Sequence, residues 1–170
     1  HVDKEGCLWI GTAGAGIFVR RGDRLARISE AQGLPDEVIS QILEDDRGWL
    51  WFGSRRGIFK IAKTDLLNCA FAGGETVTSV LFGRGDGLPG VTAVGSYQPT
   101  AYKTRSGRLW FVTRKGLVTT DPTQQENDLR PPRIYLEQFL VDGRRMDKTG
   151  AIYSSARRVE FRFTSPSFVA

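Results

Sequence analysis

The chain has 170 residues, of which 40% are hydrophobic and 25% charged, and its formal net charge is +5. This length allows one domain, or one domain and a piece of another, with a hydrophobic core of its own. The aromatic and β-branched content excludes a disordered chain, and no apolar run approaches the length of a membrane-spanning helix. The sequence starts without Met or a signal peptide and opens inside a structured segment, so we expect a fragment of a longer protein.

The charge and the cysteines restrict the function less. A pI near 9.5 is compatible with nucleic acid or acidic glycans as partners, but the basic residues are scattered as pairs, which disfavours a nucleic-acid interface. Cys7 and Cys69 are 62 residues apart and match no metal-ligand spacing. Their apolar neighbours predict buried free thiols, and the sequence leaves a disulfide between them open.

A repeat organises the first two-thirds of the chain. Its three copies are centred on Trp9, Trp51 and Trp110, at intervals of 42 and 59 residues, so the second interval carries an insertion of 17. Each copy reads Gly-x-Leu-Trp-[Ile/Phe]-x-[Thr/Ser], followed by a Gly that precedes Ile or Leu. The first Gly of each copy is expected in a tight turn, whose backbone an Asp or Ser two residues earlier can hydrogen-bond.

A period near 42 residues with several short strands is typical of a β-propeller blade. In chain order, the strands of the three blades are predicted at 8–12, 16–20 and 24–29, then at 38–43, 49–53, 57–61 and 76–83, and finally at 98–103, 108–113 and 116–120. Residues 65–74 are expected to form a loop or a short helix on the rim. The recurring Trp residues should fill the gaps between blades, and Trp49 should face the side of its blade opposite to Trp51.

The pattern changes after Asp121. Residues 121–132 are polar and contain Pro131 and Pro132, which indicates a linker. Residues 133–141 and 159–163 then read as strands, separated at first by an Asp142–Gly143 turn. The predicted fold is therefore all-β: a partial propeller of about three four-stranded antiparallel blades over 1–120, followed over 133–170 by the beginning of a β-sandwich domain.

These motifs resemble a known family. The stretches L-W-I-G-T and G-I-F at 8–18, G-L-P to G-I-F at 33–59, and G-L-P to G-L-V at 87–118 resemble the two-component regulator propeller repeats. The stretches 131–143 and 159–168 resemble the start of the three-tyrosine, immunoglobulin-like domain that follows such propellers. The third copy departs from the repeat, because Val112 stands where Gly11 and Gly53 stand.

The resemblance implies a non-catalytic sensor region of a histidine kinase or similar two-component protein. Such a region would be periplasmic or otherwise extracytoplasmic, attached to the membrane only through segments absent from this chain. Its implied ligands are oligosaccharides. The alternatives are a fragment of a propeller enzyme acting on polysaccharide, and a scaffold that docks a protein partner.

No constellation of residues predicts catalysis, a cofactor or a metal site. His1 is the only histidine and is terminal, which disfavours His-based triads and His-ligated metals. The acidic run Glu44–Asp46 leads directly into Trp49, so turn capping is expected rather than a calcium loop. The glycine-rich stretch 83–87 precedes no helix and is not a phosphate loop.

Candidate binding residues follow from propeller topology. Four antiparallel strands per blade bring the loops that join strands 2 and 3, and those that join successive blades, to one face. Arg55, Arg56, Arg114 and Lys115 would ring a mouth there with positive charge suited to an anionic sugar or a carboxylate, and Tyr97 could stack on a sugar ring. A solvated basic rim without a ligand is the alternative. Since three blades cannot close a ring, we also expect self-association through exposed blade faces.

Overall fold

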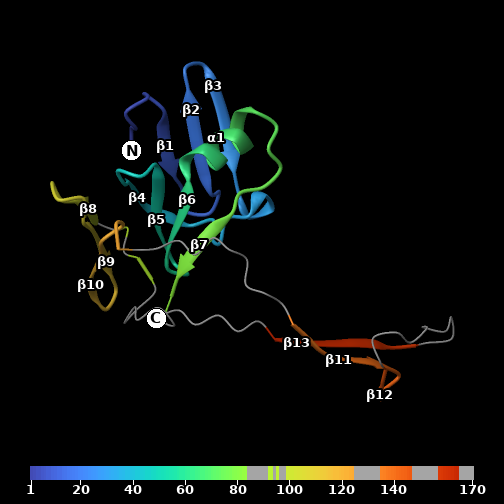
Figure 1. Cartoon of the computed structure of the whole chain (residues 1–170). Coiled ribbons are helices and arrows are strands. Elements are labelled where there is room, and N and C mark those ends of the chain that lie inside the picture. Colours follow the sequence, from blue (N-terminus) through green and yellow to red (C-terminus); the bar gives the residue numbers. More distant parts are fainter. Residues whose placement is uncertain (84–91, 94, 96–98, 125–134, 147–156, 165–170) are drawn as a thin grey trace. The chain divides into compact units, whose positions relative to one another are not determined.

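A computed structural model describes residues 1–83, 92–93, 95, 99–124, 135–146 and 157–164. The chain divides into two compact units, residues 1–125 and residues 126–170 (Figure 1). No helix in the described ranges is long and apolar enough to cross a membrane.

The first unit contains three antiparallel sheets, which confirms the predicted all-β partial propeller. Blade 1 consists of β1 (Leu8–Gly11), β2 (Ile17–Arg21) and β3 (Arg24–Ile28). Blade 2 consists of β4 (Ile39–Glu44), β5 (Trp49–Ser54), β6 (Ile58–Ala62) and β7 (Ser79–Phe82). Blade 3 consists of β8 (Ala101–Lys103), β9 (Leu109–Thr113) and β10 (Gly116–Thr120).

Only blade 2 shows the four strands expected of every blade within the described residues. In blade 1 the strand equivalent to β4 is reduced to a single antiparallel bridge between Val2 and Leu8 within the described residues. The expected rim insertion is the helix α1 (Lys63–Phe71), and a 3-10 helix (Glu30–Gln32) precedes β4. The repeated Trp residues lie on β1, β5 and β9, which occupy equivalent positions in the three blades, as the repeat predicts.

A buried aspartate closes the turn before each of the first two Trp strands. One carboxylate oxygen of Asp45 accepts the backbone N–H groups of Arg47 and Trp49, and the other accepts the Trp51 indole N–H at 2.8 Å. Asp3 makes the same set of bonds, including one from the Trp9 indole at 3.0 Å. The capping Asp lies three residues before the turn glycine, which corrects the expected two.

The third copy keeps only part of this arrangement. Thr104 takes the place of the aspartate, and its hydroxyl accepts the backbone N–H of Arg108. A hydroxyl can therefore cap the backbone turn, whereas accepting the indole N–H in the first two copies depends on a second carboxylate oxygen. In the first copy these bonds hold the pKa of Asp3 below its ordinary value, although burial acts to raise it.

Two of the three repeated Trp side chains, those of Trp9 and Trp51, fill the spaces between blades, as predicted, whereas Trp110 is only half-buried. Trp9 packs in a cluster with Leu50, Phe52 and Phe59 of blade 2. Trp51 packs with Leu109 and Phe111 of blade 3. The half-buried Trp49 packs against this second cluster, so it contributes to the same space between blades as Trp51, rather than to the opposite side of blade 2.

The glycine after each of the first two Trp strands admits the next blade. A Cβ at Gly11 would lie 2.8 Å from the Ile39 carbonyl oxygen, and one at Gly53 would lie 2.9 Å from Ala93 Cβ. Ile39 in turn donates its N–H to the Thr12 carbonyl, and Ala93 donates its N–H to the Ser54 carbonyl. The small residue in the repeat is therefore a requirement of blade-to-blade contact.

A charged network joins blade 1, blade 2 and the start of α1. Lys63 Nζ lies 2.7 Å from Glu44, and it also lies within 4 Å of Asp3 and Glu5. Burial acts to lower the pKa of Lys63, but the hydrogen bonds to the two glutamates outweigh it and raise the pKa to about 12. Three acidic side chains near the turns thus share the positive charge of one internal lysine.

Both cysteines are free, which settles the question that the sequence left open. Cys7 is fully buried, as predicted, whereas Cys69 on α1 is only half-buried. Burial raises the pKa of both thiols, which favours their protonated form.

The second unit contains one antiparallel sheet in which β11 (Tyr135–Val141) pairs with β13 (Val159–Thr164) and with β12 (Arg144–Arg145). Both long strands begin and end close to their predicted limits, and Asp142–Gly143 forms the predicted turn. Phe139 stacks on Phe161 across the sheet at 5.0 Å between ring centroids. The exposed Phe161 and Phe163 lie on the same face, so one side of this sheet is strongly apolar.

Lys60 is a buried cation in the space between blades 2 and 3. Its side chain lies over the rings of Trp49, Trp51 and Phe82, with 5.0–5.6 Å between Nζ and the ring centroids. Burial lowers the pKa of Lys60, although the Asp45 carboxylate acts in the opposite direction. Blade 1 places the buried Val19 at the equivalent position. The lowered pKa indicates that desolvation of the Lys60 charge costs more free energy than the contacts with the aromatic rings and with Asp45 contribute.

We expect Lys60→Met to stabilise the first unit by about 1 kcal/mol at neutral pH, because an apolar side chain of similar length needs no desolvation of charge. The ammonium group of Lys60 has a higher pKa in the unfolded chain than in the folded chain. The wild type therefore gains stability as the pH rises towards the ordinary lysine value of 10.5, and the advantage of the variant shrinks. Urea unfolding, followed by Trp fluorescence at several pH values, measures the unfolding free energy of each protein and its dependence on pH. A destabilised variant with an unchanged pH profile would contradict this account of Lys60.

Candidate ligand-binding face

The turns between the second and third strands are closed by the repeated Thr or Ser. The hydroxyl groups of Thr12, Ser54 and Thr113 donate to the carbonyl oxygens of Gly16, Gly57 and Gly116 respectively. Each hydroxyl also accepts a backbone N–H from the same turn, those of Ala15, Arg56 and Lys115 among them. The polar residue after each Trp strand therefore fixes the shape of the turn that follows.

These turns lie beside the segments that lead into the next blade strands. Ala13 forms a bridge with Val38, and Gly16 donates its N–H to the Glu37 carbonyl. In the next pair of blades, Ala93 donates its N–H to the Ser54 carbonyl at 2.8 Å. The loops that the topology assigns to one face of the propeller are thus in direct contact.

Asp36 organises the turn that carries Arg55 and Arg56. Its side chain is buried, with 3% of the residue exposed. One carboxylate oxygen accepts the backbone N–H of Val38, and the other accepts those of Arg55 and Arg56 at 3.0 and 3.2 Å. Three fixed donors satisfy this buried charge, so the two arginines start from a rigid backbone.

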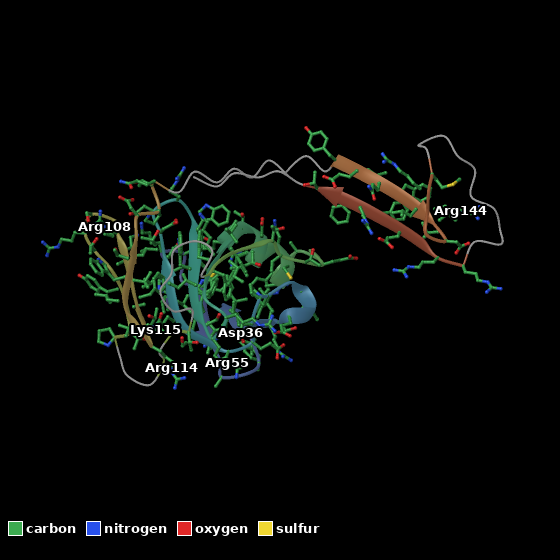
Figure 2. All side chains as sticks on the ribbon, turned by 90° about the horizontal axis from the view of Figure 1, so that it is seen from below. Asp36, Arg55, Arg108, Arg114, Lys115 and Arg144 are labelled. Atoms are coloured by element: carbon green, nitrogen blue, oxygen red, sulfur yellow. The ribbon has the colours of Figure 1, made fainter. Side chains whose placement is uncertain are left out.

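Thr92 links this turn to the equivalent turn of blade 3. Its hydroxyl donates to the Arg55 carbonyl at 3.2 Å, and its carbonyl accepts the Arg114 N–H at 3.1 Å. Two turns far apart in the sequence are thereby held side by side. Figure 2 shows Arg55, Arg114 and Lys115 on the same side of the first unit as Asp36, with Arg108 towards the opposite end.

The four basic side chains on these turns differ in their exposure and in their contacts. The Arg55 side chain is 69% exposed and its guanidinium lies 3.8 Å from Asp36. The Arg56 guanidinium donates to the Pro35 carbonyl at 2.9 Å and so has one of its donors engaged. Arg114 and Lys115 are exposed. We call these four residues the basic rim.

The basic rim thus brings together the four predicted basic residues, while the predicted Tyr97 lies outside the described residues. Beside the rim, Arg27 pairs with Glu37 at 3.3 Å, so its charge has a local partner. Exposed guanidinium groups on turns whose backbone is fixed in this way can form paired hydrogen bonds to a carboxylate or sulfate.

The two residues that position the rim, Asp36 and Thr92, are not among the predicted site residues. Asp36 follows the repeated Gly-Leu-Pro motif directly, and an Asp at that position of a loop is a recognisable capping signal. Thr92 carries no signal of its own, because its role depends on two turns that come together only in the folded chain.

Comparison with known proteins agrees with this fold. Residues 33–56 match the family described as two component regulator propeller. The structure also resembles one described as the extracellular domain of the hybrid two-component system BT3049 from B. thetaiotaomicron, with a TM-score of 0.63 and 18% sequence identity. That likeness covers 92% of this chain and 19% of the other, so this chain spans about a fifth of its length. No curated protein matches the sequence.

The Asp36→Ala variant tests whether that carboxylate positions the rim. We expect a loss of about 2 kcal/mol in unfolding free energy, because three backbone donors lose a charged acceptor. The amide protons of Arg55 and Arg56 should exchange with solvent markedly faster, as measured by NMR. Asp23→Ala, at an exposed position in the turn between β2 and β3, is the matched control and should change neither quantity. Unchanged exchange at Arg55 and Arg56 in the Asp36 variant would refute the positioning role.

Proposed function

We propose that this chain is part of the ligand-sensing, non-catalytic region of a two-component signal-transduction protein, located outside the cytoplasm. The match of residues 33–56 to the two-component regulator propeller family supports this role. The likeness to an extracellular domain of a hybrid two-component system supports the fold on which the role rests. The apolar face of the sheet formed by β11 and β13 supports a second proposal, that residues 133–170 begin an immunoglobulin-like domain that relays the signal.

The basic rim is the proposed binding site, and its ligand is an anionic oligosaccharide. The main observation behind this proposal is that exposed cationic side chains project from turns whose backbone is fixed. Arg55 lies on the turn that Asp36 holds through backbone hydrogen bonds. Arg114 and Lys115 stand on a turn held by Thr113 and Thr92. Binding therefore requires little ordering of the loops, which leaves more of the interaction free energy for affinity.

The carboxylates of a uronic acid oligosaccharide match this arrangement of charge. Each sugar ring of such an oligosaccharide carries one carboxylate, and each of the two neighbouring turns carries cationic side chains that can bind one. Neutral oligosaccharides would lack the charge-assisted hydrogen bonds that the arginines offer. We therefore expect affinity to depend on ligand charge and to fall as the salt concentration rises.

Calorimetric titration of the full chain with tetragalacturonate, and with neutral maltotetraose for comparison, tests the proposal. We expect tetragalacturonate to bind and maltotetraose to bind at least tenfold more weakly. The double variant Arg55→Ala, Lys115→Ala should weaken the binding of tetragalacturonate by at least about tenfold, since each charged hydrogen bond contributes about 1.5–3 kcal/mol.

Arg108→Ala is the matched control, because it removes one exposed arginine from the opposite end of the same unit (Figure 2). Its affinity for tetragalacturonate should equal that of the wild type. Equal loss in the control and in the rim variant would mean that general charge, not the rim, binds the ligand. No binding of tetragalacturonate, or equal binding of maltotetraose, would overturn the proposed ligand class.

A further inference from the structure

The turn before the Trp strand of blade 2 contacts blade 3 through two side chains. This turn, residues 45–48, precedes β5, and a turn of the basic rim follows the other end of the same strand. Asp46 accepts a hydrogen bond from Lys103 Nζ on β8 at 2.7 Å. The Arg47 guanidinium donates to the Pro122 carbonyl oxygen at 3.2 Å. The turn is therefore tied both to blade 3 and to the chain that follows β10.

Pro122 begins a short turn at the end of the first unit. We call residues 121–124 the exit segment, because the chain continues from them to the second unit. The Asp121 carboxylate accepts the N–H and the hydroxyl group of Thr123 at 3.0 and 2.6 Å, and the Asp121 carbonyl accepts the Gln124 N–H at 3.2 Å. These bonds lie within the segment, so its attachment to the blades depends on other contacts.

The repeat shows how the corresponding position is held in blade 2. Strand pairing aligns Pro122 with Lys63, since each lies three residues beyond the partner of the repeated Trp. Lys63 donates its backbone N–H to the Gly48 carbonyl, in the turn of its own blade, at 2.9 Å. A proline has no N–H, so Pro122 cannot form the equivalent bond to Gly107. The exit segment is thus denied the backbone bond that holds the same position of blade 2 to its own blade.

A contact from the preceding blade is present at both positions. Glu5 in the first copy and Arg47 in the second occupy the same place in the turn, four residues before the Trp. Glu5 lies 3.3 Å from Lys63 Nζ, and Arg47 reaches the carbonyl of the buried Pro122. In blade 2 this contact adds to a bond within the blade, whereas at Pro122 it takes the place of one.

We infer that Arg47 is the positioning residue that holds the exit segment, and that it does so from blade 2 across the contact with blade 3. The order of the segment therefore depends on how these two blades pack. The basic rim spans the same two blades, with Arg55 on blade 2 and Arg114 and Lys115 on blade 3. A relay follows if the proposed function holds, on which this step rests. An anionic ligand bound to both turns stabilises the contact between the blades and favours the bond from Arg47 to Pro122.

Amide exchange of the full chain, measured by NMR, tests the inference without a ligand. The N–H groups of Thr123 and Gln124 should exchange at least about fivefold faster in Arg47→Ala, because the exit segment loses a contact and opens more often. Arg47→Lys should stay closer to the wild type, since an ammonium group at this position can still donate to the carbonyl. The amides of β5 and β9 should exchange as in the wild type, which checks that the blades remain folded.

Arg105→Ala is the matched control, because it removes an exposed arginine from the equivalent turn of blade 3. Its exchange at Thr123 and Gln124 should equal that of the wild type. Unchanged exchange in Arg47→Ala would overturn the inference. An equal increase in Arg105→Ala would also overturn it, since the loss of any nearby positive charge would then have the same effect.

Tetragalacturonate tests the relay separately. Calorimetry first establishes binding, and the bound ligand should then slow the exchange of Thr123 and Gln124 in the wild type but not in Arg47→Ala. Binding that leaves the exchange of the wild type unchanged would overturn the relay through Arg47. Absence of binding would overturn the proposed ligand class instead, and the comparison of the Arg47 variants without ligand then decides whether Arg47 holds the exit segment.

Discussion

The hydrogen bonds that a buried aspartate accepts from the indole N–H of the following Trp strand fix the architecture of the first unit. In both complete copies the same carboxylate closes a backbone turn and orients a tryptophan into the space between blades. The turn and the blade contact therefore form together. Because the indole N–H is satisfied inside the core, the large ring can be buried without the cost of an unpaired donor.

The candidate site depends on this internal order. Once a tryptophan sets the position of one blade against the next, the Thr or Ser at the end of the same strand closes the adjoining turn. The turns then meet the segments that enter the next blade, and Asp36 and Thr92 join them. The scaffold needs the repeated residues, whereas Arg55, Arg114 and Lys115 stand on turn positions that the repeat leaves free to vary. Recognition of a ligand can thus change without a change of fold.

Much of the fold could be predicted from the sequence, because the signals were local. Alternation and turn glycines placed the strands, and three copies of the Trp motif in register indicated blades. The basic residues of the site could be named for the same reason, since each lies in a turn beside a recognisable strand. Lys60 could not be foreseen as a buried cation, because its three aromatic neighbours come from two strands besides its own. The role of Thr92 was equally hidden, since it bridges turns of different blades.

A double-mutant cycle on Asp45 and Trp51 tests the central interaction most directly. The unfolding free energies of Asp45→Asn, Trp51→Phe and the double variant would be compared with that of the wild type in urea, by circular dichroism. The indole bond predicts a coupling free energy of about 1–2 kcal/mol, because either single change already removes it. Losses that add to within about 0.5 kcal/mol would contradict the account, since the carboxylate and the indole would then stabilise the blades independently.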